Sequence, residues 1–144
     1  RERVEELCAK YNPALVILDA IDDIQGFGYN GDSVKRLELG QIYKWARTLA
    51  LKYCPVIGVC QASATGRNKR WLTMNDVDES KVSKQKSADW ILGIGALEDA
   101  GMDGVRFLHL SKNKLFGDKD SDPSMRHGKW QVRFRPDVVR YEDF

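Results

Sequence analysis

The sequence predicts an α/β protein whose sheet is mostly parallel, with an antiparallel hairpin at one edge. Two observations support this class. Short aliphatic runs recur along the chain, with a long helical pattern between the first two, and alternating segments flank a polar turn near the end. Parallel strands need long crossover connections, usually helical, whereas alternating segments joined by a turn are typical of a hairpin. At 144 residues and without an internal repeat, the chain is expected to form a single domain, 1–144.

The first predicted elements are a helix over 1–11 and a buried strand over 14–19. Apolar side chains recur at helical spacing in RERVEELCAKY, and Asn12 and Pro13 end the pattern because the residue before proline avoids the α region. The run ALVIL that follows is short, continuous and aliphatic, which is typical of a strand buried on both faces of a parallel sheet. This strand ends in Asp19.

A long helix and a second buried strand come next. The helix is predicted from Val34 to about Tyr53 and ends before Pro55, and the strand over 56–61 ends in the polar Gln61. The apolar stripe expected to face the core consists of Leu37, Ile42, Trp45, Ala46, Leu49 and Ala50.

The segment 62–86 is polar and basic, and we expect a long exposed loop with at most one short helix. Loops of this length are uncommon in compact domains and are often functional. A third strand is predicted over 88–95, and the segments 104–114 and 128–135 are expected to form the hairpin.

Composition excludes several classes of protein. The net charge of +2 is too small to indicate nucleic-acid binding by itself, and the three cysteines lack C-x-x-C spacing, which favours reduced structural thiols. No run approaches the roughly 18 apolar residues of a membrane span, and no signal peptide is recognisable. We therefore expect a soluble, cytoplasmic protein without membrane contact. Because Arg1 begins inside a helical pattern, we also expect the chain to be a piece of a longer protein.

Four polar side chains are predicted at the carboxyl ends of strands: Asp19, Gln61, Lys112 and Lys114. Ligands of open α/β sheets bind at these ends. One carboxylate, one amide and two ammonium groups suit a phosphate ester with a divalent metal.

The glycines at 26–31 match G-x-G-x-x-G, but their context does not fit a dinucleotide site. That site needs its first glycine directly after a strand and an acid at the end of the next strand. Here Gly26 lies seven positions after Asp19, and the next strand ends in Gln61. A phosphate-binding Walker A loop is excluded as well, because Asp32 stands where lysine must contact phosphate. Asp19 is instead interpreted as a Walker B acid that holds Mg²⁺ through water, or only as a cap of the next segment.

Features along the chain resemble, in order, the carboxy-terminal RecA-like ATPase core of DnaB-type replicative helicases, including the phage primase-helicases. They are the strand that ends in Asp19, the helix RLELGQIYKWARTLALKY, the strand PVIGVCQAS, the loop MNDVDESKVSKQKSADWILGI and the pair SKNK. The resemblance covers about Ala14 to Tyr141 and implies a fragment of a RecA-like P-loop NTPase core.

The resemblance implies roles for the residues at the strand ends. Asp19 would be the Walker B acid that coordinates Mg²⁺, and Gln61 the sensor that couples the γ-phosphate of ATP to DNA-binding loops. Lys112 and Lys114 resemble the lysine and arginine fingers that enter the ATP site of the neighbouring subunit, or each is only a solvated side chain. Lysine in place of the second finger supplies a point charge rather than a planar fork.

The resemblance also implies a loop that faces the central channel of the ring and contacts DNA phosphates. Asp76 belongs to this loop, and Asp78 stands where the family often has an arginine. The residues expected to contact DNA are Glu79, Ser80, Lys81, Lys84 and Lys86. Each of these lysines is alternatively only a solvated side chain.

A basic and aromatic segment and two histidines are the remaining candidates for binding. The segment GRNKRW, at 66–71, is either a basic and aromatic site for single-stranded DNA or a mobile surface loop. His109 and His127 have no partner at ligand spacing, so neither is assigned to a metal.

The implied function is part of an ATP-dependent replicative DNA helicase with ATP and Mg²⁺ as cofactors. Its partners would be single-stranded DNA, further copies of itself in a hexameric ring, and an attached or separate primase. The sequence contains no G-x-x-x-x-G-K-[ST], so this chain alone is not expected to hydrolyse ATP. The alternative is a non-catalytic RecA-fold module that binds DNA or a helicase partner.

Overall fold

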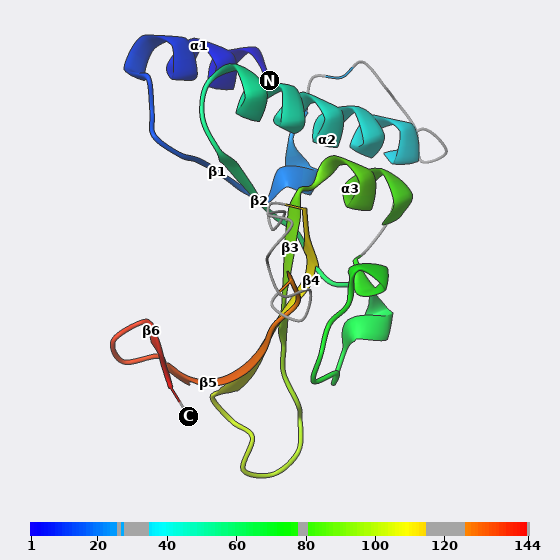
Figure 1. Ribbon diagram of the computed structural model, residues 1–144, viewed down its shortest axis with the longest axis vertical. Coiled ribbons are helices and arrows are strands. Elements are labelled where there is room, and N and C mark those ends of the chain that lie inside the picture. The colour runs from blue at the N-terminus through cyan, green and yellow to red at the C-terminus, as the bar shows by residue number, and fades with distance from the viewer. Residues whose placement is uncertain (26, 28–34, 78–80, 115–125, 144) are drawn as a thin grey trace. The chain divides into compact units, whose positions relative to one another are not determined.

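The computed structural model describes residues 1–25, 27, 35–77, 81–114 and 126–143 (Figure 1). The chain forms two compact units, the first made of Arg1–Gln61 with Glu79–Ala88 and the second of Ala62–Asp78 with Asp89–Phe144. The single domain expected over the whole chain stays a prediction. Within the described part of the chain, no helix combines the length and the apolar character that crossing a membrane requires.

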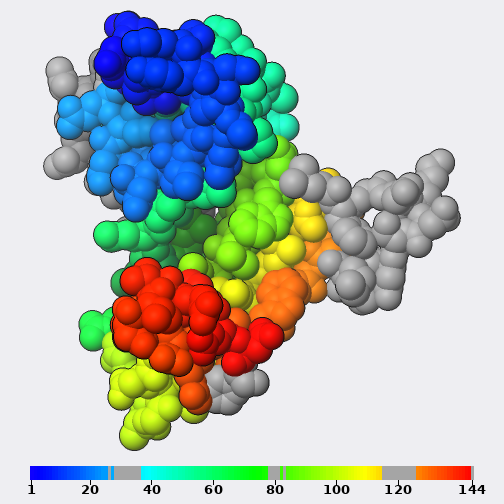
Figure 2. All heavy atoms as spheres, turned by 90° about the vertical axis from the view of Figure 1, so that its left-hand side faces the viewer, coloured from blue at the N-terminus to red at the C-terminus, as the bar shows by residue number. Residues whose placement is uncertain are grey.

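The first unit is built on a parallel strand pair. Its elements are α1 (Glu2–Tyr11), β1 (Val16–Asp19), the 3-10 helix η1 (Ile21–Asp23), α2 (Lys35–Lys52), β2 (Val56–Val59) and α3 (Lys81–Ser87). Val16 lies opposite Val56, and Asp19 lies opposite Val59. The order helix, strand, helix, strand that we predicted for this part of the chain is confirmed. Figure 2 shows α1 and the residues that follow it, in blue, on one face of this unit.

The core of the first unit lies between its helices and the strand pair. It consists of Cys8, Leu18, Ile21, Leu39, Ile42, Trp45, Ala46 and Leu49. Leu39 and Ile42 are each 1% exposed, whereas Leu37, which we expected inside, is 63% exposed. Leu37 precedes Leu39 by two positions, which is about 200° around a helix, so the two cannot share a face. The prediction for Leu37 is therefore wrong.

The outer face of the β1–β2 pair is apolar and exposed. Ile17 and Ile57, which lie opposite each other, are 61% and 46% exposed, and Leu15 and Val59 are exposed as well. Leu18, on the other face of β1, is buried. Within the described residues these strands are therefore covered on one face, not on both as the sequence suggested.

The second unit is an antiparallel sheet with short 3-10 turns. Its elements are η3 (Ala64–Gly66), η4 (Met74–Asp76), β3 (Trp90–Gly95), β4 (Val105–Asn113), β5 (Lys129–Arg135) and β6 (Arg140–Asp143), and the strand order is β3-β4-β5-β6. The predicted hairpin is confirmed, with Val105 opposite Arg133 and His109 opposite Lys129. The last strand, β6, was not predicted.

The predominance of parallel pairing that we expected is not confirmed. The protein is α/β, but the described residues contain one parallel pair, β1–β2, beside four antiparallel strands. The reason lies in the connection between β3 and β4, because the segment 96–104 contains no helix. Parallel strands need a crossover of about a dozen residues or more, so a connection this short makes β3 antiparallel to β4.

Segment 69–72 crosses β3 where two glycines leave room for its backbone. A Cβ atom at Gly95 would collide with the carbonyl oxygen of Arg70, and one at Gly93 would lie 2.6 Å from the Cβ atom of Leu72. Lys69 also forms an isolated bridge with Ala96, just after β3. This part of the predicted exposed loop is thus packed on the sheet.

Candidate functional site

The carboxyl ends of β1 and β2 form one edge of the parallel pair. Asp19 ends β1 and lies opposite Val59, which ends β2, and Gln61 follows Val59 by two positions. The side chains of Asp19 and Gln61 are both exposed, and the peptide bond between Asp19 and Ala20 is cis. Strands that run in the same direction bring their end residues to the same edge, so these two predicted site residues lie at one edge of the sheet.

The donors at this edge fit a magnesium ion that is held mostly by other ligands. Among the described residues, no group of three or more His, Cys, Asp or Glu side chains is placed to hold a metal. Mg²⁺ keeps several water ligands and is usually bound through one or two carboxylates together with substrate phosphates. The exposed carboxylate of Asp19 would be one ligand of such an ion.

Asp22, the middle residue of η1, lies at the centre of a polar cluster. The Tyr43 hydroxyl donates to its Oδ1 at 2.9 Å, and the Lys84 ammonium donates to its Oδ2 at 2.6 Å. The same ammonium lies 5.4 Å from the centre of the Tyr43 ring. Burial, together with the neighbouring Cys60 and Asp22, raises the pKa of Tyr43 well above its usual range, so the phenol stays protonated and donates.

Lys84 is therefore buried, and this corrects its predicted place in the DNA-contacting set. Its side chain is 3% exposed. A buried ammonium that is bonded to a carboxylate is not available to a DNA phosphate, because breaking the pair would leave the charge of Asp22 without its partner. Lys86, two positions further along α3, is exposed. At the end of the same helix, the Arg47 guanidinium donates to the carbonyl oxygen of Ser87 at 3.0 Å.

The remaining residues of the DNA-contacting set precede or begin α3. Glu79 and Ser80 lie outside the described residues, and so does the side chain of Lys81, whose backbone begins the helix. Their contacts with DNA stay predictions. Lys86 is the member of the set that the structure places on a surface.

Lys112 and Lys114 lie together at the end of β4, in the second unit. Lys112 is opposite Ile91 and half-buried, whereas the side chain of Lys114 is 48% exposed. The backbone N–H of Lys114 donates to the carbonyl oxygen of Asp89 at 2.8 Å, and its ammonium lies 3.8 Å from the Asp89 carboxylate. Exposed ion pairs of this kind contribute little stability.

Asp76 is a structural residue of the second unit, whereas the resemblance placed it in a channel-facing loop. Its carboxylate, 5% exposed, accepts hydrogen bonds from the Lys69 ammonium at 2.7 and 2.9 Å. The backbone N–H and the hydroxyl of Thr73 each donate to it at 2.8 Å. Burial alone would raise the pKa of Asp76, but the bonds from Lys69 and Thr73 outweigh it and lower the pKa to about 2.

The GRNKRW segment makes further contacts within its own unit. The Arg67 guanidinium donates to Glu98 at 3.0 Å, and the Arg70 guanidinium lies 5.1 Å from the centre of the Phe107 ring. The Trp71 ring packs edge-on against Phe107, with 5.2 Å between the ring centres. These contacts indicate that the segment packs within its own unit. Its contact with DNA stays a prediction.

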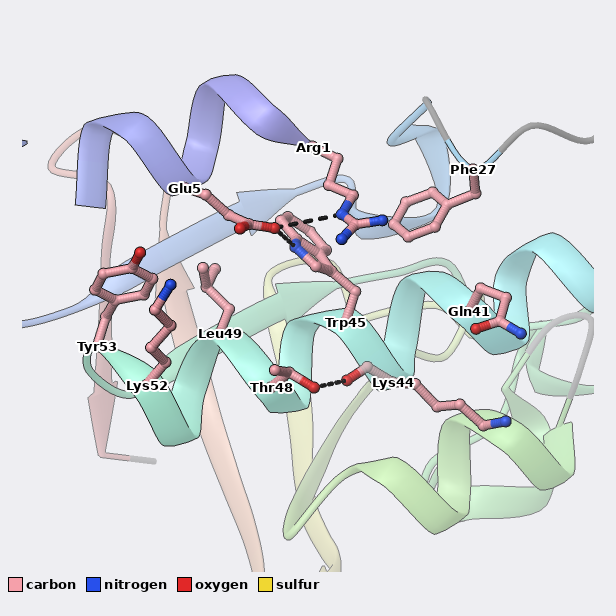
Figure 3. A pocket seen from close by; sticks show the side chains of 10 residues that line it. All are labelled: Arg1, Glu5, Phe27, Gln41, Lys44, Trp45, Thr48, Leu49, Lys52 and Tyr53. Atoms are coloured by element: carbon pink, nitrogen blue, oxygen red, sulfur yellow. Dashed lines mark hydrogen bonds and ion pairs between the residues drawn. The ribbon is translucent and has the colours of Figure 1, made fainter. Parts of the chain in front are cut away.

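A cavity of about 310 Å³ lies between α1 and α2 (Figure 3). The Trp45 indole donates to the Glu5 carboxylate at 2.7 Å and lowers the pKa of Glu5, and Arg1 donates to the same carboxylate at 3.3 Å. The Arg1 guanidinium also lies 5.6 Å from the centre of the Phe27 ring. Figure 3 shows that these groups point toward one another, and no predicted site residue lines the cavity.

Sequence reasoning missed Asp22 and Tyr43. The available signal was the spacing of the lysines, because Lys84 and Lys86 are two positions apart and cannot share a helical face. The sequence offers no comparable signal for the partner of Lys84, since Asp22 is 62 positions away.

Comparison with known proteins gives a similar solved structure but no match by sequence. No protein-family model matches the chain, and no curated protein matches it. Among solved structures, it is similar to that of a DnaB-like replicative helicase, studied with its interactions with primase, with a TM-score of 0.73 and 16% sequence identity. The similarity covers 99% of this chain and 33% of that one, so the chain spans about a third of the helicase's length. In fold, the chain is similar to part of a DnaB-like replicative helicase.

Proposed function

We propose that the chain is part of an ATP-dependent replicative DNA helicase that translocates on single-stranded DNA. The observation that carries the proposal is the parallel pair β1–β2, with Asp19 at the carboxyl end of β1 and Gln61 just after that of β2. Ligands of open α/β sheets bind at that edge, and the likeness to a DnaB-like replicative helicase supports a nucleotide there.

Asp19 would hold a magnesium ion of the bound nucleotide through water. The ion neutralises charge that develops on the transferred phosphoryl group. Gln61 carries an amide that both donates and accepts, so its hydrogen bonds differ with and without a γ-phosphate beside it. That difference suits it to report the state of the nucleotide to the DNA-contacting residues.

Lys112 and Lys114 would enter the ATP site of a neighbouring copy in a ring, which we expect to hold six copies. An ammonium group stabilises phosphate as a point charge, without the two-pronged geometry of arginine. The weak pairing of Lys114 with Asp89 fits a residue that must change partner when the interface forms.

Lys81 and Lys86, with Glu79 and Ser80, would contact the backbone of single-stranded DNA. A translocating protein must bind every sequence alike, and phosphate contacts carry no sequence information. A primase, attached or separate, is the further partner that we propose.

The test of this function is Asp19→Asn in the longer protein that carries the phosphate-binding loop. The amide keeps the shape of the side chain and loses the charge that holds the metal. Magnesium-dependent ATP turnover should fall about a hundredfold or more, since a catalytic metal supplies several kcal/mol. Asp23→Asn, at an exposed carboxylate in η1 four positions further on, is the matched control and should keep its activity. Wild-type turnover in Asp19→Asn would contradict the proposal.

A further inference from the structure

Two lysines of α3 have different surroundings. Lys86 is exposed, and we propose that it contacts DNA. Lys84 is 3% exposed in its side chain and is bonded to Asp22. One short helix therefore carries an exposed lysine, which is a proposed DNA contact, and a buried bond to another element of the same unit.

The element bonded to Lys84 is η1, which comes shortly after Asp19, the proposed magnesium ligand, in the chain. η1 begins at Ile21, two positions after Asp19, and Asp22 is its middle residue. Ile21 is 2% exposed and belongs to the core of the unit. Asp22 is therefore joined to the end of β1 by a short length of chain that includes a core residue.

The bond between Lys84 and Asp22 has a fixed geometry. The Lys84 ammonium donates to one carboxylate oxygen of Asp22, and the hydroxyl of Tyr43, in α2, donates to the other. With both oxygens occupied, the carboxylate is held in one orientation. Separating the pair is unfavourable because it leaves the buried charge of Lys84 without compensation. The pair therefore links α3 to η1.

We propose that Lys84 is a positioning residue that couples α3 to the turn after Asp19, so that DNA bound on α3 regulates ATP turnover. The inference rests on the proposed function and names a regulation of that same site. Lys84 itself contacts neither DNA nor nucleotide. Its contribution is to make the position of η1 depend on the position of α3.

The test measures ATP turnover with and without single-stranded DNA in the longer protein, and DNA affinity separately. Lys84→Met keeps a long side chain and removes the charge. Turnover without DNA and DNA affinity should stay within about twofold of wild type, whereas the stimulation of turnover by DNA should fall about fivefold or more. Asp22→Asn should cause the same loss. The double variant should lose no more than either single one, because the two residues act as a unit.

Two controls separate coupling from simple packing of the helix. Lys84→Arg keeps the charge and should retain most of the stimulation. Arg47→Gln removes the bond from α2 to the carbonyl oxygen of Ser87 and leaves Lys84 and Asp22 in place, so it should also retain stimulation. A loss in Arg47→Gln equal to that in Lys84→Met would overturn the inference, because loosening α3 alone would explain both.

The remaining outcomes separate this inference from the proposed function. Wild-type protein without DNA-stimulated turnover would overturn the proposed function and the coupling with it. Stimulated wild type together with an equally stimulated Lys84→Met would overturn the coupling alone. If circular dichroism shows that Lys84→Met does not fold, Asp22→Asn, which keeps an acceptor for Tyr43, decides by the same criterion.

Discussion

At the scale of single residues, Asp76 shows how a carboxylate in a polar segment becomes a structural centre. Lys69 and Thr73 donate four hydrogen bonds to it, and the backbone N–H of Ser63 donates to its carbonyl oxygen at 2.7 Å. The side chain is nearly inaccessible to water, so its charge depends on these donors rather than on solvent.

Asp76→Asn should destabilise the second unit by about 2 kcal/mol near neutral pH. This is the free energy that corresponds to lowering the pKa of Asp76 from 3.8 to about 2. The ionised form is favoured in the folded state. Its contribution is therefore complete well above pH 3.8 and is lost as the pH falls through about 2. Urea unfolding of wild type and variant at both ends of this range measures the difference.

The control for this prediction is Asp137→Asn. The bond from Arg135 lowers the pKa of Asp137 as well, but this pair is exposed and should contribute little. An Asp76→Asn effect that is independent of pH would contradict the assigned cause.

At the scale of elements, the close approach of segment 69–72 to β3 depends on residues without a side chain. Gly95→Ala places a methyl group against the carbonyl oxygens of Lys69 and Arg70. The backbone has to shift, and overpacking of this kind costs about 1–3 kcal/mol. Thermal unfolding should show this loss, whereas Ile94→Val, at the exposed neighbouring position, should stay within about 0.5 kcal/mol of wild type. Equal stability of the two variants would show that the contact is not tight.

The elements that the sequence predicts are those whose signal is local. The helical spacing in α2, the aliphatic runs of β1 and β2 and the alternating residues of β4 and β5 each lie within a short window. The strand or side chain with which a residue pairs is not set by a local pattern. The antiparallel pairing of β3 depends on the length of the 96–104 connection and not on a pattern within the strand, and the bond from Lys84 to Asp22 joins residues that no local pattern relates. The placement of Asp19 and Gln61 at one edge was predictable because parallel strands bring their ends to the same edge, whereas their roles stay predictions.

At the scale of the whole molecule, the proposed chemistry is divided between the two units. Asp19 and Gln61 belong to the first, and Lys112 and Lys114 to the second. In a ring of identical copies with head-to-tail interfaces, one copy can supply the strand-end residues of a site and its neighbour the lysines.

Mixing subunits tests this division. Lys114→Ala and Asp19→Asn subunits of the longer protein should each be inactive as a homogeneous ring. Mixed in equal amounts, they should recover up to about a quarter of wild-type turnover, because some interfaces combine the intact half of each variant. A mixture as inactive as either parent would indicate that both residues serve the site of one subunit.

The three cysteines, Cys8, Cys54 and Cys60, all lie in the first unit, and Cys8 and Cys54 are buried. Burial raises the pKa of the Cys8 thiol, and only the thiolate reacts readily with an alkylating reagent. Alkylation of Cys8 under native conditions therefore proceeds through opened states, and its rate gives the free energy of opening. The second unit contributes no thiol. Iodoacetamide labelling followed by mass spectrometry therefore measures the opening of the first unit alone, and no cysteine has to be added by mutation.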